Sequence, residues 1–265
     1  MKSKLIMIPL LIFFVLNTIS ATNVRAETDL NKMKSYIQKK YAGQQPKLWG
    51  EKIPGVILRL PTNKKVIALT FDACGGSKGS GYDAELINYL RRKHIPATLF
   101  INARWIDENH NRFMALSKMP QFEIENHGYL HKPLSVNGKS AWGIKGTSSP
   151  AEVVDEVYMN KLKIAKLTGR TPKFFRPGTA YFDDVAVKIV YEVGQKPLNY
   201  DILGDAGATF NRQQVKNALL SSKPGSIVIM HMNQPKGETF EGLKVAIPIL
   251  QKRGYKFVKL DDYIK

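Results

Sequence analysis

The 265-residue sequence is poor in cysteine and comparatively poor in acidic residues. Its single cysteine, Cys74, cannot form an intramolecular disulfide, so the fold depends on its hydrophobic core rather than on a disulfide framework. Asp and Glu number 22 against 40 Lys and Arg, which gives a formal net charge of +18. The sequence shows neither an internal repeat nor a low-complexity tract, which argues against a repeat architecture.

The first apolar run of the chain is too short to span a membrane. Residues 5–16 are apolar, but this stretch is shorter than the roughly 20 residues that a spanning helix needs. It follows Lys2 and Lys4 and precedes Val24-Arg25-Ala26, which together are typical of a cleaved signal peptide. We therefore predict a signal peptide over residues 1–26 and a protein that is periplasmic or secreted, with no membrane span after cleavage. An uncleaved anchor is the alternative.

Removal of this segment takes away three basic residues and no acidic one, which leaves a formal charge of 18 − 3 = +15. A strongly basic protein can bind nucleic acid, anionic lipid or an anionic wall polymer. The basic residues are spread along the chain rather than gathered in a run, so we expect no nucleic-acid partner. Export favours a cell-wall glycan, with a merely solvated surface as the alternative. The sequence leaves the oligomeric state undetermined.

The pattern after Val66 indicates a single α/β domain over residues 66–265. Short apolar runs alternate there with longer amphipathic segments, as in βα units that build a parallel sheet. We predict a distorted (β/α) barrel with about seven parallel strands at residues 66–71, 97–102, 122–126, 173–176, 197–201, 226–230 and 256–260. Residues 27–65 form an N-terminal lead-in, with a helix near 29–41 and a strand at 56–60, which we expect to cover the barrel floor or one edge.

The clearest helix signal follows Ser149. Ser149 is a good N-cap, Pro150 suits the first helical position and Glu152 can complete a capping box. Gly169 is the expected C-terminal stop.

Polar residues with catalytic potential lie at or just beyond the C-terminal ends of five predicted strands: Asp72, His127, Arg176, Asp201 with Asp205, and His231. The C-terminal rim is where parallel α/β barrels place their catalytic residues. We therefore expect an active site at this rim rather than five unrelated structural roles.

His127 and His131 are four residues apart on one turn and can reach a single metal ion from the same side. Their neutral nitrogen donors favour zinc or a similar transition ion, although histidines also cap helices and fill cores. Two histidines leave a third protein ligand to be found. The candidates are the carboxylates of Asp72 and Asp83, between which the residues alone do not decide.

Two aromatic residues are candidates for substrate binding. Trp142 lies in the long loop over residues 134–148, which follows the histidine pair, and is expected either to stack on a sugar or to pack. Tyr181 follows Arg176 closely and is the second candidate.

These segments together resemble the polysaccharide deacetylases, carbohydrate esterase family four, over roughly residues 66–265. The similar motifs are Thr70-Phe71-Asp72, the pair His127 and His131, Phe175-Arg176-Pro177, and Ile229-Met230-His231. The resemblance implies that Asp72 is the general base and is steered by Arg176. It also implies that the histidine pair holds a divalent ion, with zinc expected and cobalt or another transition ion as alternatives.

His231 would then be the general acid, with Asp205 as the expected catalytic aspartate beside it and Asp201 as the alternative. The implied reaction is metal-dependent hydrolysis of N-acetyl groups on a polysaccharide, first of all N-acetylglucosamine of peptidoglycan. Chitin-like oligomers, poly-N-acetylglucosamine and acetylated xylan are further candidates. Two rival functions are O-acetyl ester hydrolysis and glycan binding by an exported, inactive deacetylase scaffold.

The departures from the family pattern concern the metal site first. The family has a second aspartate directly after the first as a metal ligand, whereas this sequence has Ala73 followed by Cys74. We expect Asp72 or Asp83 to replace that ligand, or metal affinity to be reduced. For Cys74 we expect a small buried thiol, with a reactive or metal-binding thiol as the alternative. Gly178 stands where a second proline is common, and the tract from Asp201 to Asp205 lacks the family's tryptophan.

Overall fold

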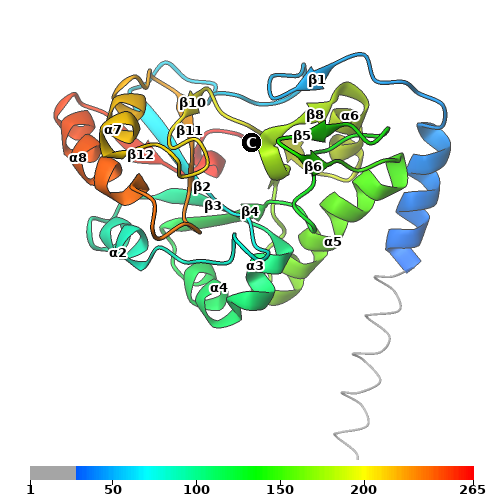
Figure 1. Ribbon diagram of the computed structural model, residues 1–265, viewed down its shortest axis with the longest axis horizontal. Coiled ribbons are helices and arrows are strands. Elements are labelled where there is room, and N and C mark those ends of the chain that lie inside the picture. Colours follow the sequence, from blue (N-terminus) through cyan, green and yellow to red (C-terminus); the bar gives the residue numbers. More distant parts are fainter. Residues whose placement is uncertain (1–27) are drawn as a thin grey trace, which may run out of the picture.

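The computed structural model describes residues 28–265, which form an α/β fold (Figure 1). The predicted signal peptide, residues 1–26, lies outside the described residues. A helix over residues 28–40 begins the described part, close to the predicted lead-in helix. Among the described residues, no helix has the length and apolar character needed to cross a membrane.

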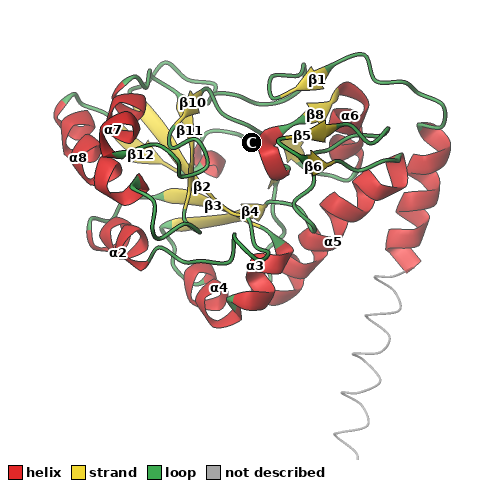
Figure 2. Ribbon diagram, viewed as in Figure 1, coloured by secondary structure: helices red, strands yellow, loops and turns green. Residues whose placement is uncertain are grey.

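The central sheet confirms the predicted fold class: seven parallel strands form a curled half-barrel (Figure 2). Their order is β10-β11-β2-β3-β4-β7-β9, and β12 pairs with the first residues of β2. These seven strands together with β12 have the following bounds: β2 (Val66–Ala73), β3 (Ala97–Ile101), β4 (Phe122–Asn126), β7 (Phe174–Phe175), β9 (Lys196–Pro197), β10 (Ile202–Leu203), β11 (Ser226–His231) and β12 (Lys256–Val258).

Helices pack outside this sheet, as Figure 2 shows. They are α2 (Ala84–Arg92), α3 (Ala103–Glu108), α4 (His110–Ser117), α5 (Pro150–Thr168), α6 (Asp184–Glu192), α7 (Arg212–Leu220) and α8 (Thr239–Lys252). Two small antiparallel pairs complete the fold: β1 (Trp49–Gly50) with β8 (Phe182–Asp183), and β5 (Ser140–Ala141) with β6 (Ile144–Lys145).

Strand β2 shows why the sheet forms. All eight of its residues are buried. Both faces of this parallel strand are covered, and its sequence is accordingly almost continuously apolar. It lies between β3 and β11, and its side chains join the main hydrophobic core with α2, α7 and α8. The register with β11 places Asp72 directly opposite His231.

The start of α5 follows the predicted signals closely. Ser149 caps the helix by accepting a hydrogen bond from the Glu152 backbone N–H, and Gly169 ends it in a left-handed conformation with φ 71°. The Glu152 side chain, however, accepts from Ser148 N and Oγ rather than from the cap residue. The expected capping box is therefore displaced by one residue.

The predicted strand over residues 197–201 is wrong in its extent. Only Pro197 belongs to β9, and residues 198–201 cross the opening between β9 and β10, which are the two edges of the sheet. Leu198, Asn199 and Tyr200 are buried in this crossing, where Leu198 forms a single bridge with Ile57.

An N-terminal arm, residues 47–60, also crosses this opening. Ile57 N donates to Pro197 O at 3.0 Å, and Ile57 O accepts from Asn199 N at 2.8 Å. Leu60 N donates to Gly225 O at 2.8 Å, just before β11 begins. The arm thus connects the β9 edge to the start of β11, and the lead-in is part of the barrel wall.

Candidate active site

The C-terminal ends of β2, β4, β7 and β11 open into a cavity of ≈ 1040 Å³. Because these strands are parallel, the residues that follow them meet at one rim. The cavity is lined by most of the predicted site residues, namely Asp72, His127, His131, Trp142, Tyr181, Asp201 and His231. It is also lined by residues from the arm and by Cys74.

Asp72 and Arg176 form a buried ion pair at the floor of the site. Arg176 Nη1 donates to Asp72 Oδ1 at 2.7 Å, and both side chains are almost wholly inaccessible to solvent. Arg176 Nη2 donates to Thr70 Oγ1 at 2.9 Å and so fixes the plane of the guanidinium. Burial raises the pKa of Asp72, but the charge of Arg176 together with nearby histidines outweighs burial, so this pKa lies below its usual value. Asp72 is therefore ionised and oriented.

His127 follows β4 and turns one ring nitrogen toward the cavity. Its Nδ1 donates to the Arg176 carbonyl oxygen at 2.9 Å, which leaves Nε2 free as an electron-pair donor. Nε2 lies 3.6 Å from Asp72 Oδ2. The arginine residue therefore orients the base with its side chain and the histidine with its backbone.

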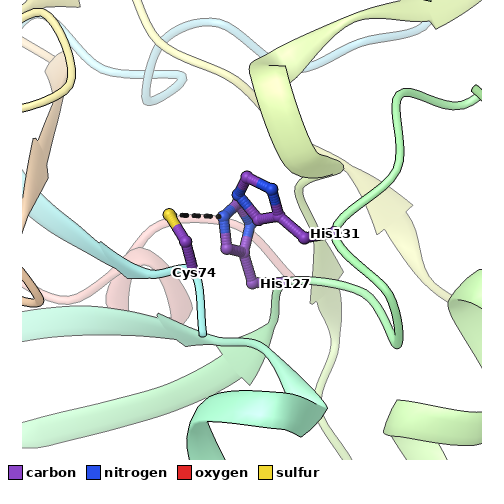
Figure 3. A group of neighbouring side chains, drawn as sticks. All are labelled: Cys74, His127 and His131. Carbon is purple, nitrogen blue, oxygen red and sulfur yellow. Dashed lines mark hydrogen bonds between the residues drawn. The ribbon is translucent and has the colours of Figure 1, made fainter. Parts of the chain in front are cut away.

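His131 and Cys74 complete a group of three potential metal ligands (Figure 3). The ligand atoms of Cys74, His127 and His131 all lie within 4.8 Å of one another, and Cys74 Sγ is 3.8 Å from His127 Nε2. The two imidazoles meet edge to face, with ring centroids 4.8 Å apart. One thiolate and two imidazoles are a donor set that suits zinc or a similar transition ion. The residues present thus fit a metal ion.

The surroundings of Cys74 favour its thiolate form. Burial raises the pKa of this thiol, but the electrostatic influence of the neighbouring imidazoles, that of His131 first, lowers it well below its usual value. Thiolate is the form that binds metal. Sequence reasoning favoured a small buried thiol for Cys74 over a reactive or metal-binding one. The signal that it missed is the order Asp72-Ala73-Cys74, in which β2 ends at Ala73 and the chain turns at Cys74 toward the histidines.

Asp83, one of the two expected third ligands, is placed differently. It is the N-cap of α2, where its Oδ1 accepts from Leu86 N at 2.9 Å, and it does not belong to the ligand group. Burial is the main reason why the pKa of Asp83 is raised. Its carboxylate already has the structural role of a helix cap.

His231 and Asp205 form the second buried pair of the site. His231 Nδ1 donates to Asp205 Oδ1 at 2.9 Å, and the His231 backbone N–H donates to Asp205 Oδ2 at 2.7 Å. Burial lowers the pKa of His231, but the charge of Asp205 outweighs burial and holds this pKa well above its usual value. His231 is therefore protonated and oriented, as a general acid must be.

Asp201, the alternative partner of His231, has a different set of contacts. It forms an ion pair with Arg59 of the arm and accepts from Ser226 Oγ at 2.9 Å and from Ile227 N at 2.8 Å. These contacts attach the arm to the start of β11. The structure places Asp205 beside His231, in agreement with the sequence-based choice.

Close backbone packing positions His131. Its φ is 61°, a conformation that side chains other than glycine rarely adopt. The loop is held by Glu156, whose carboxylate accepts from Leu130 N and Lys132 N. Gly178 lies against the other side, where an added Cβ would overlap the His131 carbonyl oxygen. This contact explains why glycine stands where the family commonly has proline.

Backbone strain concentrates around the cavity. Seven of the described non-glycine residues have positive φ, and five of these line the cavity: His131, Trp142, Thr179, Ala180 and Ala206. Such conformations cost on the order of 1–3 kcal/mol each and persist where the surrounding structure enforces them, most often at functional sites.

The site therefore combines an ionised carboxylate, a protonated imidazole and a group of three metal donors in one cavity. Hydrolases in which a base activates water and an acid protonates the leaving group rely on such a combination.

The chain belongs to the polysaccharide deacetylase family, whose model matches residues 59–198. It is accordingly a hydrolase of the polysaccharide deacetylase class. It is 24% identical over 214 residues to a peptidoglycan-N-acetylglucosamine deacetylase of Bacillus cereus, a match that covers 79% of this chain and 93% of that protein.

Solved structures of carbohydrate esterase family four share the fold. One is a pseudoenzyme from Bacillus anthracis, with a TM-score of 0.67, 24% identity, and coverage of 81% of this chain and 70% of that one. Another is an acetyl xylan esterase from Clostridium thermocellum in complex with a cobalt ion. Its TM-score is 0.60, its identity is 25%, and the match covers 75% of this chain and 90% of that one.

Proposed function

We propose that this protein is an exported, metal-dependent N-deacetylase of a cell-wall glycan, with Cys74, His127 and His131 as the three protein ligands of the ion. The observation that carries the proposal is the convergence of these three donor atoms, within 4.8 Å of one another, beside the Asp72–Arg176 pair. Asp72, which sequence reasoning considered as a ligand, is committed to Arg176 through Oδ1 and remains the base.

A divalent ion bound by this donor set would supply Lewis acidity toward the acetyl carbonyl and lower the pKa of a bound water. Zinc is the ion that this soft and borderline donor set favours. Three protein ligands leave a position open for water or substrate, as in catalytic rather than structural zinc sites.

The chain's own residues supply the proton transfers. Asp72 is ionised at neutral pH and accepts a proton from the attacking water, while Arg176 holds the carboxylate in place and restrains its reorientation. His231 donates its proton to the nitrogen of the departing amine, and Asp205 keeps the imidazole in the required orientation and charge state. The base and the acid lie on adjacent strands, directly opposite each other in register.

Three observations support peptidoglycan N-acetylglucosamine as the substrate. The predicted signal peptide would bring the enzyme to the wall, the formal charge of +15 after its removal favours an anionic polymer, and the Bacillus cereus relative is named for this activity. Trp142 and Tyr181 line the same cavity and are proposed to contact the sugar.

The test is acetate release from peptidoglycan, from N-acetylglucosamine oligomers and from acetylated xylan by purified protein. Release that a chelator stops and added zinc restores supports the proposal, whereas release from acetylated xylan alone supports the O-acetyl esterase. Binding of a glycan with no release from any of these substrates would support the inactive, glycan-binding scaffold.

The role of Cys74 has a separate readout. Cobalt-loaded protein should show a thiolate-to-cobalt charge-transfer absorption that is absent in Cys74→Asp and Cys74→Ala. Cys74→Asp should retain zinc and activity, because carboxylate is also a zinc ligand, whereas Cys74→Ala should lose both. Cobalt binding without the charge-transfer band would remove Cys74 from the ligand set. Inactivity of Cys74→Asp with full zinc content would indicate that the thiol reacts instead.

A further inference from the structure

The N-terminal arm, residues 47–60, contributes a wall to the catalytic cavity. Trp49, Gly50, Glu51, Lys52 and Ile53 all line the same cavity as Cys74 and His231. The sequence analysis assigned this region only to the barrel floor or an edge. Its position at the catalytic rim therefore needs its own functional explanation.

The arm is held firmly at this position by hydrogen bonds at both ends of the wall. Before Trp49, Lys47 N and Leu48 N donate to Asp184 Oδ1 at 2.8 and 2.9 Å. After it, Tyr200 OH donates to Glu51 Oε2 at 2.8 Å. Strand β1 also pairs with β8, with Trp49 opposite Asp183. The indole is thus placed by the fold rather than by a free loop.

Trp49 belongs to a row of three aromatic rings along the cavity. The Trp49 and Tyr181 centroids are 5.5 Å apart, and the Tyr181 and Trp142 centroids are 6.1 Å apart with an interplanar angle of 90°. These residues come from β1, from the loop before β8 and from the turn between β5 and β6. Three segments distant in sequence therefore bring their aromatic rings together at the cavity.

Trp142 is held in an unfavourable position within this row. It is 74% exposed, and with φ 52° it occupies the left-handed region that bulky residues avoid. Hairpin turns of two residues require positive φ and normally use Asn, Asp or Gly, so a tryptophan there is costly for folding. Neither burial nor turn geometry explains this tryptophan, and a strained exposed aromatic group at a cavity rim points to ligand contact.

We propose that Trp49, Tyr181 and Trp142 bind a neighbouring sugar ring of the glycan while the acetylated ring occupies the metal and acid–base site. The ligand class is a chain of β-linked pyranoses, because their equatorial substituents leave apolar C–H faces that pack on aromatic rings. This inference rests on the proposed function. It makes the enzyme selective for chains over single sugars.

The test compares kcat/KM for acetate release from mono-, di- and tetra-N-acetylglucosamine. In Trp49→Ala and in Trp142→Ala, the ratio of tetramer to monomer kcat/KM should fall by about five- to tenfold, mainly through KM, as expected for loss of one aromatic contact. Tyr36→Ala is the matched control, because Tyr36 is 51% exposed and does not line the cavity. Its ratio should equal that of the wild type.

Binding separates this inference from the proposed function. Tetramer affinity is measured by calorimetry on zinc-loaded Asp72→Asn, alone and combined with Trp49→Ala, Trp49→Phe or Trp142→Ala. Weaker binding with alanine but not with phenylalanine at position 49 supports binding of the sugar by the row of aromatic rings, even if the wild type releases no acetate. Acetate release with an unchanged tetramer-to-monomer ratio and unchanged affinity in both alanine variants overturns it, while the deacetylase function stands.

Discussion

Replacement of Asp72 by Asn separates the catalytic from the structural role of the buried ion pair. The substitution keeps the shape of the side chain and an oxygen that can accept from Arg176, but it removes the negative charge. Loss of the general base should lower kcat/KM by about 10²–10⁴-fold. The structure predicts a second effect, because Arg176 has 0% side-chain exposure and would be left as an uncompensated buried charge.

Breaking a buried ion pair by removing one partner typically costs about 3–5 kcal/mol. Arg176 keeps its bonds to Thr70 Oγ1 and the Asn199 carbonyl, so we expect the lower end, about 3 kcal/mol. The pKa of Asp72 is lowered in the folded state, so the pair stabilises the protein above the unfolded pKa and loses this contribution as pH falls through the folded pKa. The variant should therefore lose stability at neutral pH and lack this acid dependence.

Acetate release by zinc-loaded protein and urea unfolding at several pH values measure the two effects. Asp107→Asn is the control, because it breaks an exposed pair with Lys163 and should cost at most about 1 kcal/mol without loss of activity. Near-wild-type turnover in Asp72→Asn would refute its role as base. An unchanged free energy of unfolding would refute the argument from the buried charge of Arg176.

Three further predictions concern the metal and the acid. Replacement of both His127 and His131 by Ala should reduce bound zinc to background in elemental analysis, and unchanged zinc would place the ion elsewhere. Asp205→Asn removes the charge that raises the pKa of His231, so the alkaline limb of the kcat/KM profile should move to lower pH; an unmoved limb would exclude His231 as the titrating acid. Gly178→Ala should displace the His131 loop and weaken zinc binding by about tenfold or more in a competition titration, and unaltered affinity would contradict the packing argument.

The strand-end residues were the most predictable part of the site. Asp72, His127, Arg176 and His231 lie at or just beyond the C-terminal ends of strands whose apolar runs are evident in the sequence, and parallel strands bring these ends together. Local patterns and topology were therefore sufficient to place them.

The proposed third metal ligand, Cys74, and the row of three aromatic rings were not predictable in this way. The direction of Cys74 depends on the turn after β2 rather than on any periodic pattern, and Asp83 was as plausible until the structure showed it capping α2. Trp49 reaches the cavity through the pairing of β1 with β8, a contact between residues more than 130 positions apart that no local signal encodes.

The crossing made by the N-terminal arm has a consequence for fragments of this protein. A fragment that begins at Val66 would retain the four segments that resemble the family motifs, but it would expose backbone groups of β9 and of the start of β11 that the arm now pairs. Unpaired strand edges are templates for association with other chains. Such a fragment should aggregate, although it contains all the residues assigned to catalysis and metal binding.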